Sequence, residues 1–494
     1  MADEEQASPP AASPARRGMR DLTSGPIGKT LLAFAVPTLI SSILQSLNGS
    51  INTIWVGRFL GEDALAATSN ANMTMFLLMS FVFGFGMAAT VLIGQAFGRR
   101  DLDGVRRAFG TAIGGFVPVA AAIAVLGWIF APSLLHLLAT PPASQPLAVA
   151  YLRVIFIAMP PLLLAVVVMM GLRGTGDAVT PLWFMIVSVV LDSGLNPVFI
   201  LGLGPAPRLG IAGSATATVI ANYTALIGIL IYIYVRDLPL RLRGAELRYL
   251  IPDPALLKTI VVKGVPMGLQ MIVISSSALA TLGLVNREGV DTTAAFGVAL
   301  QLWTYIQMPA MALGAAVSAM AAQNIGAGKW ERVSAITRSG ILYNLLITGV
   351  LVVLLAIADR PALALFLGGN SPALPIAEHI QLLATWSFLL LGITMILFGT
   401  VRANGAVIGP LIIFAIGLFP VRLGFALGAY PWLGADALWL SFPVSSFANL
   451  AMAVGYYLHG GWKKARMGAP ISIDEAIEEA EGAAMPGGRL KPSG

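Results

Sequence analysis

One acidic residue stands apart from the other carboxylates of the chain. All of the 24 Asp and Glu residues except Asp192 fall in the tails, in hydrophilic loops or at the ends of apolar segments, whereas Asp192 lies near the middle of the apolar segment 181–203. A carboxylate at the centre of a membrane-spanning helix costs about 2.5–3.5 kcal/mol on insertion scales, so by default it indicates a pathway for ions or protons. Burial disfavours the charged form, so Asp192 could bind and release a proton near neutral pH, whereas a shell of oxygen ligands would favour Na⁺.

Side-chain amides accompany this carboxylate. Asn196 lies one turn beyond Asp192 on the same helical face, and Gln45, Asn48 and Asn52 recur at three- and four-residue spacing in the first apolar segment. Such a polar stripe must face protein or water rather than lipid. We therefore expect these five residues to handle a cation. The alternative is that Asp192 stays neutral and that all of them only hold helices together by hydrogen bonds.

Arg422 is the other charged residue well inside an apolar segment. We expect it to be structural, fixing helix ends or a contact between the two halves of the chain. The alternative is an arginine that extends its head group outward to the membrane surface.

The composition excludes a soluble protein. Only 11% of the 494 residues are charged, against about 25% in an average soluble domain, and 57% are apolar. The mean hydropathy of +0.82 requires many membrane spans, because one span needs only about 20 apolar residues. The absence of cysteine excludes disulfides, thiolate metal sites and cysteine catalysis, and three scattered histidines leave little for an imidazole metal site. We expect no cofactor and no metal other than Na⁺ at Asp192.

Cutting the chain at charged and Pro/Gly-rich breaks gives about twelve candidate transmembrane helices. The predicted spans are 30–55, 65–95, 108–134, 147–171, 181–203, 211–235, 264–286, 293–322, 339–358, 378–400, 409–428 and 437–458. The sequence thus predicts an all-α integral membrane protein.

Basic residues identify the side on which each loop lies. One alternate set of loops contains most of the lysines and arginines and both tails, and the other contains only Arg58, Arg153, Arg208, Arg287 and Arg360. By the positive-inside rule the first set is cytoplasmic. We expect a multi-pass protein of the cell (inner) membrane with disordered or solvated cytoplasmic tails at 1–27 and 461–494 and a cytoplasmic amphipathic linker at 236–263.

The two halves of the chain contain a repeat. Gly94-Gln95 and Ala322-Gln323 begin similar segments 228 residues apart, and two further matches are offset by 229: Val36-Pro37 with Val265-Pro266, and Leu172-Arg173-Gly174 with Val401-Arg402-Ala403. Six spans per half return the chain to its starting side, so the halves have the same orientation. The repeat predicts two parallel six-helix lobes, 28–235 and 264–460, with a central substrate cavity between them, which is a transporter architecture.

Aromatic and methionine side chains on the second and eighth spans, which are equivalent in the repeat, could line that cavity. Methionine surfaces repack easily around varied ligands. The candidates are Met73, Phe76, Trp303, Tyr305 and Met308. The alternative is that each simply faces lipid or the protein core.

At this point the sequence resembles the multidrug and toxic compound extrusion (MATE) family over roughly residues 28–460. The resemblance rests on the order and spacing of short motifs: Val56-Gly57-Arg58 with Gly61; Gly94-Gln95 with Gly98; Gly171-Leu-Arg-Gly174 with Gly176, Asp177 and Pro181; Leu195-Asn196-Pro197; Gly213 with Ala215 to Thr218; and the counterparts around Gln323 and Arg402. It implies export of amphipathic, often cationic compounds in exchange for inward H⁺ or Na⁺ by rocking of two six-helix lobes.

The resemblance also implies a cation site in the first lobe. In the family this site combines an Asp on the first span with an Asn and an Asp one turn apart on the fifth. Here Asn52 occupies the first-span position, and Asp192 followed by Asn196 reverses the order of the DinF-like members. Ile274 and Leu391 stand roughly where the NorM-like branch has second-lobe acids, so the chain looks closer to the DinF-like branch. One carboxylate ringed by amides could carry one H⁺, which we favour over Na⁺.

Other functions fit the sequence less well. A lipid-linked oligosaccharide flippase of the same superfamily would need cationic residues in its cavity for a pyrophosphate, and only Arg422 qualifies. A polytopic membrane transferase would need clustered acids or histidines, whereas His136, His379 and His459 are far apart. We therefore predict a monomeric transporter rather than an enzyme, with a small amphipathic substrate, membrane lipid around it and no nucleic-acid partner.

Overall fold

The computed structural model describes residues 21–137 and 145–467, and at 62–63, 65–67 and 69–78 only the backbone is described. All regular elements in these residues are helices. Twelve of the helical segments are long and apolar enough to cross a membrane, as the sequence predicts. The chain is therefore an all-α multi-pass membrane protein.

The first half of the chain forms six long helices. They are α1 (Ile27–Leu60), α2 (Glu62–Gly98), α3 (Leu102–Leu137), α4 (Gln145–Gly174), α5 (Val179–Leu201) and α6 (Ile211–Val235). They pack around an apolar core in which α4 contributes buried side chains to both hydrophobic clusters of the first half and packs against α2, α3 and α6.

The second half also crosses six times, but two of its spans are interrupted. Its helices are α7 (Pro254–Val285), α8 (Val290–Gly326), α9 (Trp330–Ile357), the short α10 (Asp359–Leu367), α11 (Ala373–Ala384), α12 (Phe388–Arg402), α13 (Ile408–Ile416), α14 (Gly424–Leu433) and α15 (Asp436–His459). The 3₁₀ turn η3 (Thr385–Ser387) joins α11 to α12, and the π-helical turn η4 (Gly417–Leu423) joins α13 to α14.

The seventh span begins ten residues earlier than the sequence predicts, at Pro254 instead of 264. Asp253 caps this helix, since its Oδ1 accepts hydrogen bonds from the backbone N–H groups of Ala255 (2.9 Å) and Leu256 (3.3 Å). A proline at the first helical position loses no hydrogen bond and has a helical φ. The part of the predicted linker that lies outside this span is therefore 236–253, which includes the 3₁₀ helix η1 (Gly244–Leu250).

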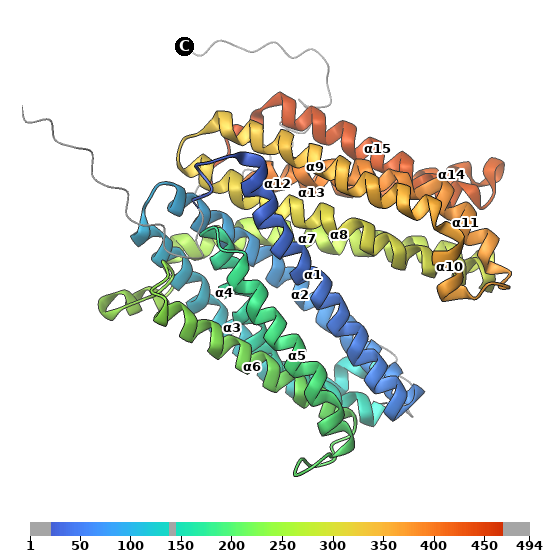
Figure 1. Cartoon of the computed structure of the whole chain (residues 1–494), viewed down its shortest axis with the longest axis horizontal. Coiled ribbons are helices and arrows are strands. Elements are labelled where there is room, and N and C mark those ends of the chain that lie inside the picture. The colour runs from blue at the N-terminus through green and yellow to red at the C-terminus, as the bar shows by residue number, and fades with distance from the viewer. Residues whose placement is uncertain (1–20, 138–144, 468–494) are drawn as a thin grey trace, which may run out of the picture.

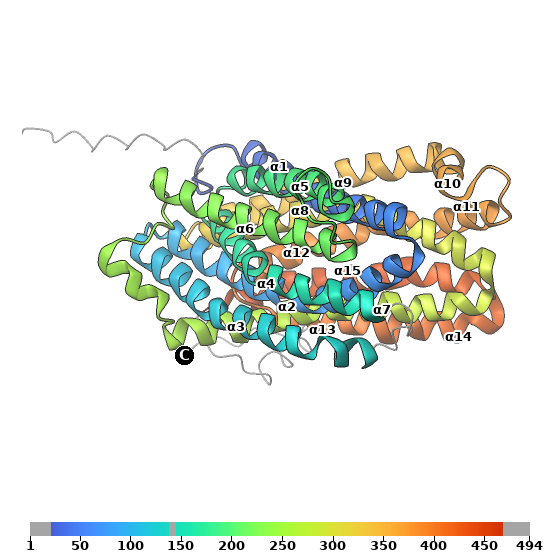
Figure 2. The same cartoon turned by 90° about the horizontal axis from the view of Figure 1, so that it is seen from below.

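The two halves form two lobes that meet at one end. In Figure 1 the helices of the first half run toward the lower right and those of the second half toward the right, and the two groups converge at the left. Figure 2 shows the molecule from below, with α10, α11 and α14 of the second half at the right-hand end. At the convergent end, one apolar cluster contains Met87 and Met170 of the first half together with Met267 and Leu397 of the second. We call this the closed end.

The lobes approach each other most closely where helices cross at glycines. A Cβ atom added to Gly84 of α2 would collide with the backbone of α7 at Gly264 and Gly268. Small residues of this kind let two helix backbones come into van der Waals contact within a membrane. The crossing of α2 and α7 is therefore a place where the two halves make close backbone contact.

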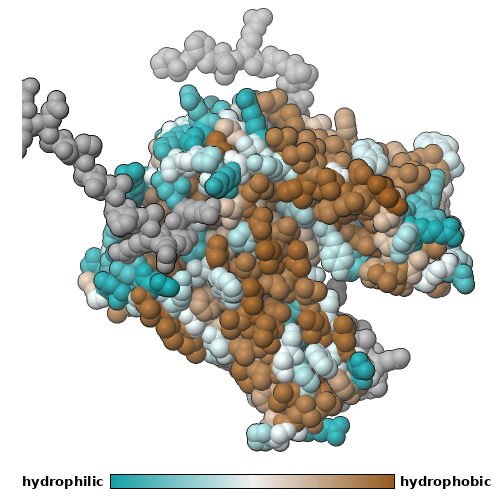
Figure 3. Space-filling view, viewed as in Figure 1, coloured by the Kyte–Doolittle hydropathy of each residue, from teal (hydrophilic) through white to brown (hydrophobic). Residues whose placement is uncertain are grey.

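The surface matches a membrane setting. Figure 3 shows broad hydrophobic flanks, hydrophilic residues gathered toward the ends, and a notch between the lobes on the side away from the closed end. The flanks contain large exposed apolar side chains on outer helices, for example Val125 and Trp128 on α3 and Leu346 and Val353 on α9. In a soluble protein such a surface would aggregate, whereas in a bilayer it contacts lipid.

Candidate functional site

A buried carboxylate in the first lobe accepts hydrogen bonds from three helices. Asp192, in the middle of α5, is 1% exposed. Its Oδ2 atom accepts from Asn48 Nδ2 (2.8 Å) and Asn52 Nδ2 (2.9 Å), both on α1. Its Oδ1 atom accepts from Thr218 Oγ1 on α6 (3.0 Å) and from Asn196 Nδ2 (3.2 Å) one turn along α5. We call these five residues the carboxylate site.

The spacing along each helix brings the partners together. Asn48 and Asn52 are four residues apart, as are Asp192 and Asn196, so each pair lies on one helical face. The two pairs face each other, because Asn196 Nδ2 also donates to Asn52 Oδ1 (2.9 Å). Sequence reasoning therefore placed these four side chains on faces that the structure brings into contact.

The hydrogen-bonding pattern suits an ionised carboxylate. Every described partner of the two Asp192 oxygens donates, so the negative charge is satisfied by oriented N–H and O–H groups. Beside it, Asn48 Oδ1 and Asn196 Oδ1 are buried without a partner in the described part of the chain. These two amide oxygens are acceptors available to a proton on Asp192 or, together with the carboxylate, to a hard cation.

Thr218 is the site residue that sequence reasoning missed as a ligand of the carboxylate. Its hydroxyl also approaches the backbone oxygen of Ser214 (3.3 Å), which is the bond that a helical threonine normally makes. Thr218 belongs to the motif of small residues on the sixth span, Gly213 with Ala215 to Thr218. A hydroxyl among glycine and alanine in a sequence indicates close helix packing rather than a ligand of a carboxylate.

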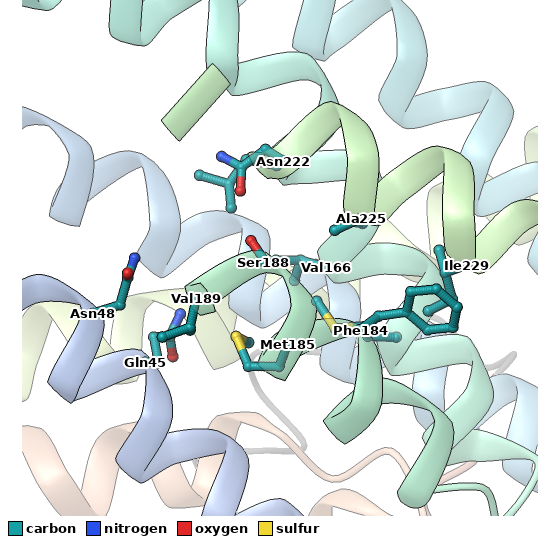
Figure 4. Close-up of a pocket in the computed structure, with 13 residues that line it drawn as sticks. Gln45, Asn48, Val166, Phe184, Met185, Ser188, Val189, Asn222, Ala225 and Ile229 are labelled. Atoms are coloured by element: carbon teal, nitrogen blue, oxygen red, sulfur yellow. The ribbon is translucent and has the colours of Figure 1, made fainter. Parts of the chain in front are cut away.

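A cavity of about 100 Å³ lies next to the carboxylate site inside the first lobe. In Figure 4, Gln45 and Asn48 of α1, Phe184 and Ser188 of α5, and Asn222 of α6 surround it. Gln45 therefore faces this cavity and has no described hydrogen bond to Asp192. The walls combine apolar side chains with a few amides and a hydroxyl, which is the usual lining of a small-molecule site.

The aromatic and methionine residues proposed for the central cavity lie elsewhere or outside the description. The side chains of Met73 and Phe76 are not among the described residues. The prediction that Trp303 lines the central cavity is wrong, because its side chain is 0% exposed in the core of the second lobe. Tyr305 is exposed and Met308 is half-buried, and neither lines a described cavity.

The burial of Trp303 has a clear physical cause. Its ring packs against those of Phe296, Phe388 and Phe442, and its indole N–H donates to Gln381 Oε1 (2.8 Å) and Thr385 Oγ1 (2.8 Å). A tryptophan with its N–H satisfied is stable in a core. Sequence position on an equivalent helix could not reveal these partners.

Arg422 lies inside the second lobe. It is buried on η4, its Nε donates to Ser445 Oγ on α15 (3.1 Å), and its guanidinium carbon lies 4.4 Å from the centroid of the Phe442 ring. Cation–π contact and a hydroxyl partner hold the head group within the lobe. The described contacts thus join η4 to α15 rather than the two lobes, and the head group does not extend outward.

Reciprocal hydrogen bonds join the lobes at the closed end. Gln95 Nε2 of α2 donates to the backbone oxygen of Ala403 (2.7 Å), and Gln323 Nε2 of α8 donates to that of Gly174 (2.8 Å). In the repeat, Gln95 corresponds to Gln323 and Gly174 to Ala403, so the two bonds are related by the pseudo-two-fold axis. We call Gln95 and Gln323 the glutamine pair.

The backbone around the glutamine pair follows the same symmetry. A Cβ added to Gly98 would collide with the backbone oxygen of Gln323, and one added to Gly326 would collide with that of Gln95. Each helix end therefore requires glycine where the other helix passes. Residues that identified the repeat in the sequence thus take part in the contact between the lobes.

Comparison with known proteins gives a consistent result. Residues 37–198 and 266–427 match the MatE family model. The probable multidrug resistance protein YoeA of Bacillus subtilis is 38% identical over 440 residues, which cover 89% of this chain and 95% of that protein. A FAD transporter of Shewanella oneidensis is 28% identical over 88% of this chain and 95% of its own length.

Solved structures share the fold. An outward-facing multidrug resistance MATE family transporter of the MOP superfamily superposes with a TM-score of 0.82 at 19% identity, over 91% of this chain and 99% of that chain. A Vibrio cholerae MATE transporter in the bent form gives a TM-score of 0.80 at 18% identity, over 92% of this chain and 98% of that chain.

Proposed function

The chain belongs to the MatE family of multi-pass membrane transporters, and we therefore propose that it exports small amphipathic, mainly cationic compounds in exchange for H⁺ entering at Asp192. It is a transporter and not an enzyme. The proposal rests on the carboxylate site: one buried carboxylate, ringed by donors from three helices, beside two unpartnered amide oxygens.

Binding of a proton at this site would change the hydrogen bonds that join the helices around Asp192. The ionised carboxylate accepts from α1, α5 and α6 together. Protonation turns one carboxylate oxygen into a donor, which needs an acceptor such as Asn48 Oδ1 or Asn196 Oδ1. The amides must then rearrange. Loss or gain of one proton is thereby coupled to the packing of three helices that line the first-lobe cavity.

The proton suits the described donor set better than Na⁺. A sodium ion needs several inward-facing oxygens, and here the N–H groups of Asn48, Asn52 and Asn196 face the carboxylate. Within the described residues no group of three or more His, Cys, Asp or Glu side chains gathers. Coupling to Na⁺ would require these amides to turn their oxygens inward.

The two lobes supply alternating access. The closed end carries the turns that contain Arg99, Arg100 and Lys329 and the first turn of α9 with Arg332, so by the positive-inside rule it faces the cytoplasm and the notch in Figure 3 faces outward. Both tails then lie in the cytoplasm of an inner-membrane protein. Transport requires the glutamine pair to separate and the notch to close in the opposite state.

The flippase alternative finds no support in the cavities. In the described residues the first-lobe cavity has no lysine or arginine in its lining, and Arg422 is enclosed by α15. A pyrophosphate group would lack the cations that normally bind it.

Everted membrane vesicles test the proposal. With an imposed pH gradient, wild type should drive uptake of a fluorescent organic cation, and Asp192→Asn should abolish gradient-driven uptake at equal expression. Asp177→Asn is the matched control: Asp177 is also buried, but its Oδ1 only caps α5 by accepting from Val179 N (3.0 Å) and Thr180 N (2.9 Å), which an amide oxygen can also do.

Two results would overturn the proposal. Wild-type transport by Asp192→Asn would remove the coupling role of the carboxylate. Uptake driven by a Na⁺ gradient alone would replace H⁺ with Na⁺ as the coupling ion.

A further inference from the structure

A second cavity, of about 290 Å³, lies in the other lobe at the end away from the glutamine pair. It is formed by α9, α10, α11 and η3, and Figure 1 places α10 and α11 at the right-hand end of the molecule. Its volume is close to the lower limit for small-molecule sites, about 300 Å³. Neither the carboxylate site nor its neighbouring cavity shares a residue with it.

One wall presents a hydrogen-bond donor that has no partner. Gln381 is 5% exposed, and its Oε1 accepts from the indole N–H of Trp303 and from the hydroxyl of Thr385. An indole nitrogen can only donate, so this bond fixes the orientation of the amide. Gln381 Nε2 is then left buried without a partner among the described residues, and Gln381 is one of the residues that line the cavity. Such a group is costly unless something binds it.

The opposite requirement, an acceptor without a partner, lies in the same lining. Asp359 Oδ1 is buried and has no hydrogen-bond partner in the described part of the chain. The charged groups nearby do not neutralise it. Glu378 adds a second negative charge, and its Oε1 is 3.8 Å from Arg360 Nε, while His379 Nε2 is 2.8 Å from Asp436 Oδ1.

The mouth of the cavity is apolar and faces the surroundings of the protein. Leu382 is 75% exposed and Trp386 is 46% exposed, and both line the cavity. Tryptophan is enriched where a protein meets the membrane–water interface. A ligand in this cavity could therefore keep an apolar part against these side chains or in the outer lipid.

We propose that this cavity binds an amphipathic ammonium compound, with its ammonium on Asp359, a hydrogen-bond acceptor on Gln381 Nε2, and its apolar part along Leu382 and Trp386. Two sources share this chemistry: a soluble aryl- or alkylamine, and the ethanolamine headgroup of a phospholipid. The site is independent of the coupling role assigned to Asp192.

The ionisation of Asp359 gives the site a pH dependence. Burial, and after it the charge of Glu378, raises the pKa of Asp359 to about 6. Above that pH the carboxylate is charged and holds an ammonium, and below it the neutral acid does not. Binding should therefore weaken as the pH falls through about 6.

Equilibrium binding to purified full-length protein tests the site with two probes, radiolabelled tyramine and lysophosphatidylethanolamine. Asp359→Asn should raise the Kd of the bound probe at least about tenfold at pH 7.5, as expected for the loss of one hydrogen bond to a charged group. It should also flatten the pH profile. Asp436→Asn, a carboxylate at the same end outside the cavity lining, should leave the Kd unchanged. In His379→Gln the pH profile should persist.

Ala356→Phe provides a second variant, because Ala356 lines the cavity and a phenyl ring there would fill it without changing a charge. It should also abolish binding. Asp192→Asn should bind both probes as wild type does, which separates this site from the transport proposal. The site is refuted if Asp359→Asn and Ala356→Phe both bind normally, or if binding disappears in Asp192→Asn. Saturation by tyramine alone identifies a soluble amine site, and saturation by the lysolipid alone identifies a lipid headgroup site.

Discussion

At the scale of single residues, the charge on Asp192 depends on donors that differ in how replaceable they are. Asn196 is on the same helix and can follow the carboxylate, whereas Thr218 reaches it from α6 with one hydroxyl. Hydrogen bonds to charged groups contribute about 1.5–3 kcal/mol each. Thr218 is therefore a donor from another helix whose hydroxyl can be removed while the amides of α1 and α5 stay in place.

We predict that Thr218→Val lowers proton-driven transport roughly tenfold or more, because an isosteric side chain without a hydroxyl leaves Asp192 Oδ1 with one donor fewer. Uptake rates in everted vesicles at matched expression measure the effect. Thr216→Val is the control, since among the described residues the Thr216 hydroxyl bonds only its own helix, at Ala212 O (2.7 Å). Equal rates in the two variants would show that the α6 contact plays no part in coupling.

Sequence patterns could identify the carboxylate site because charge is so scarce in this chain. Asp192 stood out as a charge within an apolar segment. The four-residue spacing placed Asn48 and Asn52 on one face of the first span, and Asn196 on the same face of the fifth span as Asp192. The same reasoning could not separate Trp303 from a cavity residue, because burial in a lobe core and exposure to a cavity both favour aromatic side chains. Only the partners supplied by η3 and its neighbours decide between them.

At the scale of elements, helix ends depend on local caps that hydropathy does not register. The predicted seventh span began where the apolar run begins, whereas α7 begins at Asp253–Pro254 because a side-chain cap satisfies its first N–H groups. These backbone hydrogen bonds lower the pKa of Asp253 below its usual range. The eleventh span likewise contains η4, a π-helical turn at Pro420 that an apolar run could not indicate.

We predict that Asp253→Ala destabilises the start of α7 by about 1 kcal/mol, the usual cost of losing an N-cap, and that Asp253→Asn costs less because its amide oxygen still accepts. Since the folded-state pKa is lowered, the cap contributes above the unfolded pKa and is lost as the pH falls through the folded value. Hydrogen exchange at 255–257 measures both effects. Equal protection in Asp253→Ala and wild type would contradict the cap.

At the scale of the whole molecule, the proposed transport cycle makes the closed end the part that sets the balance between two access states. The glutamine pair, the glycines beside it and the shared methionine-rich cluster are among the described contacts between the halves, and the proposed transport cycle requires them to separate. The twelve spans and the two lobes could be predicted from hydropathy and the repeat, since both depend on composition over long segments. Which state the molecule occupies depends on a few hydrogen bonds, and it could not be predicted from the sequence.

We predict that Gln95→Leu shifts the population toward the state open at the other end by about fivefold, for one hydrogen bond of about 1 kcal/mol. Gln323→Leu should shift it further, because Gln323 Oε1 also accepts from the backbone N–H of Leu22 (3.2 Å). The native chain has no cysteine, so one engineered cysteine beside the closed end reports its accessibility to a water-soluble thiol reagent. Gln301→Leu is the control, because Gln301 is also on α8 but bonds only Tyr305 in the described residues. Unchanged labelling in both glutamine-pair variants would exclude a gating role.

In the terms used for oligomers, the closed end is an isologous interface made within a single chain. The same helix end occurs twice and each copy binds the other around a two-fold axis, as in a symmetric homodimer. In a homodimer the two subunits have the same sequence, so every substitution acts at both contacts. In this chain Gln323 bonds Gly174 and Gln95 bonds Ala403, so each contact can be strengthened or weakened alone. Because the two lobes are joined in one chain, a substitution can change the free energy of closure at one of the two contacts and leave the other unchanged.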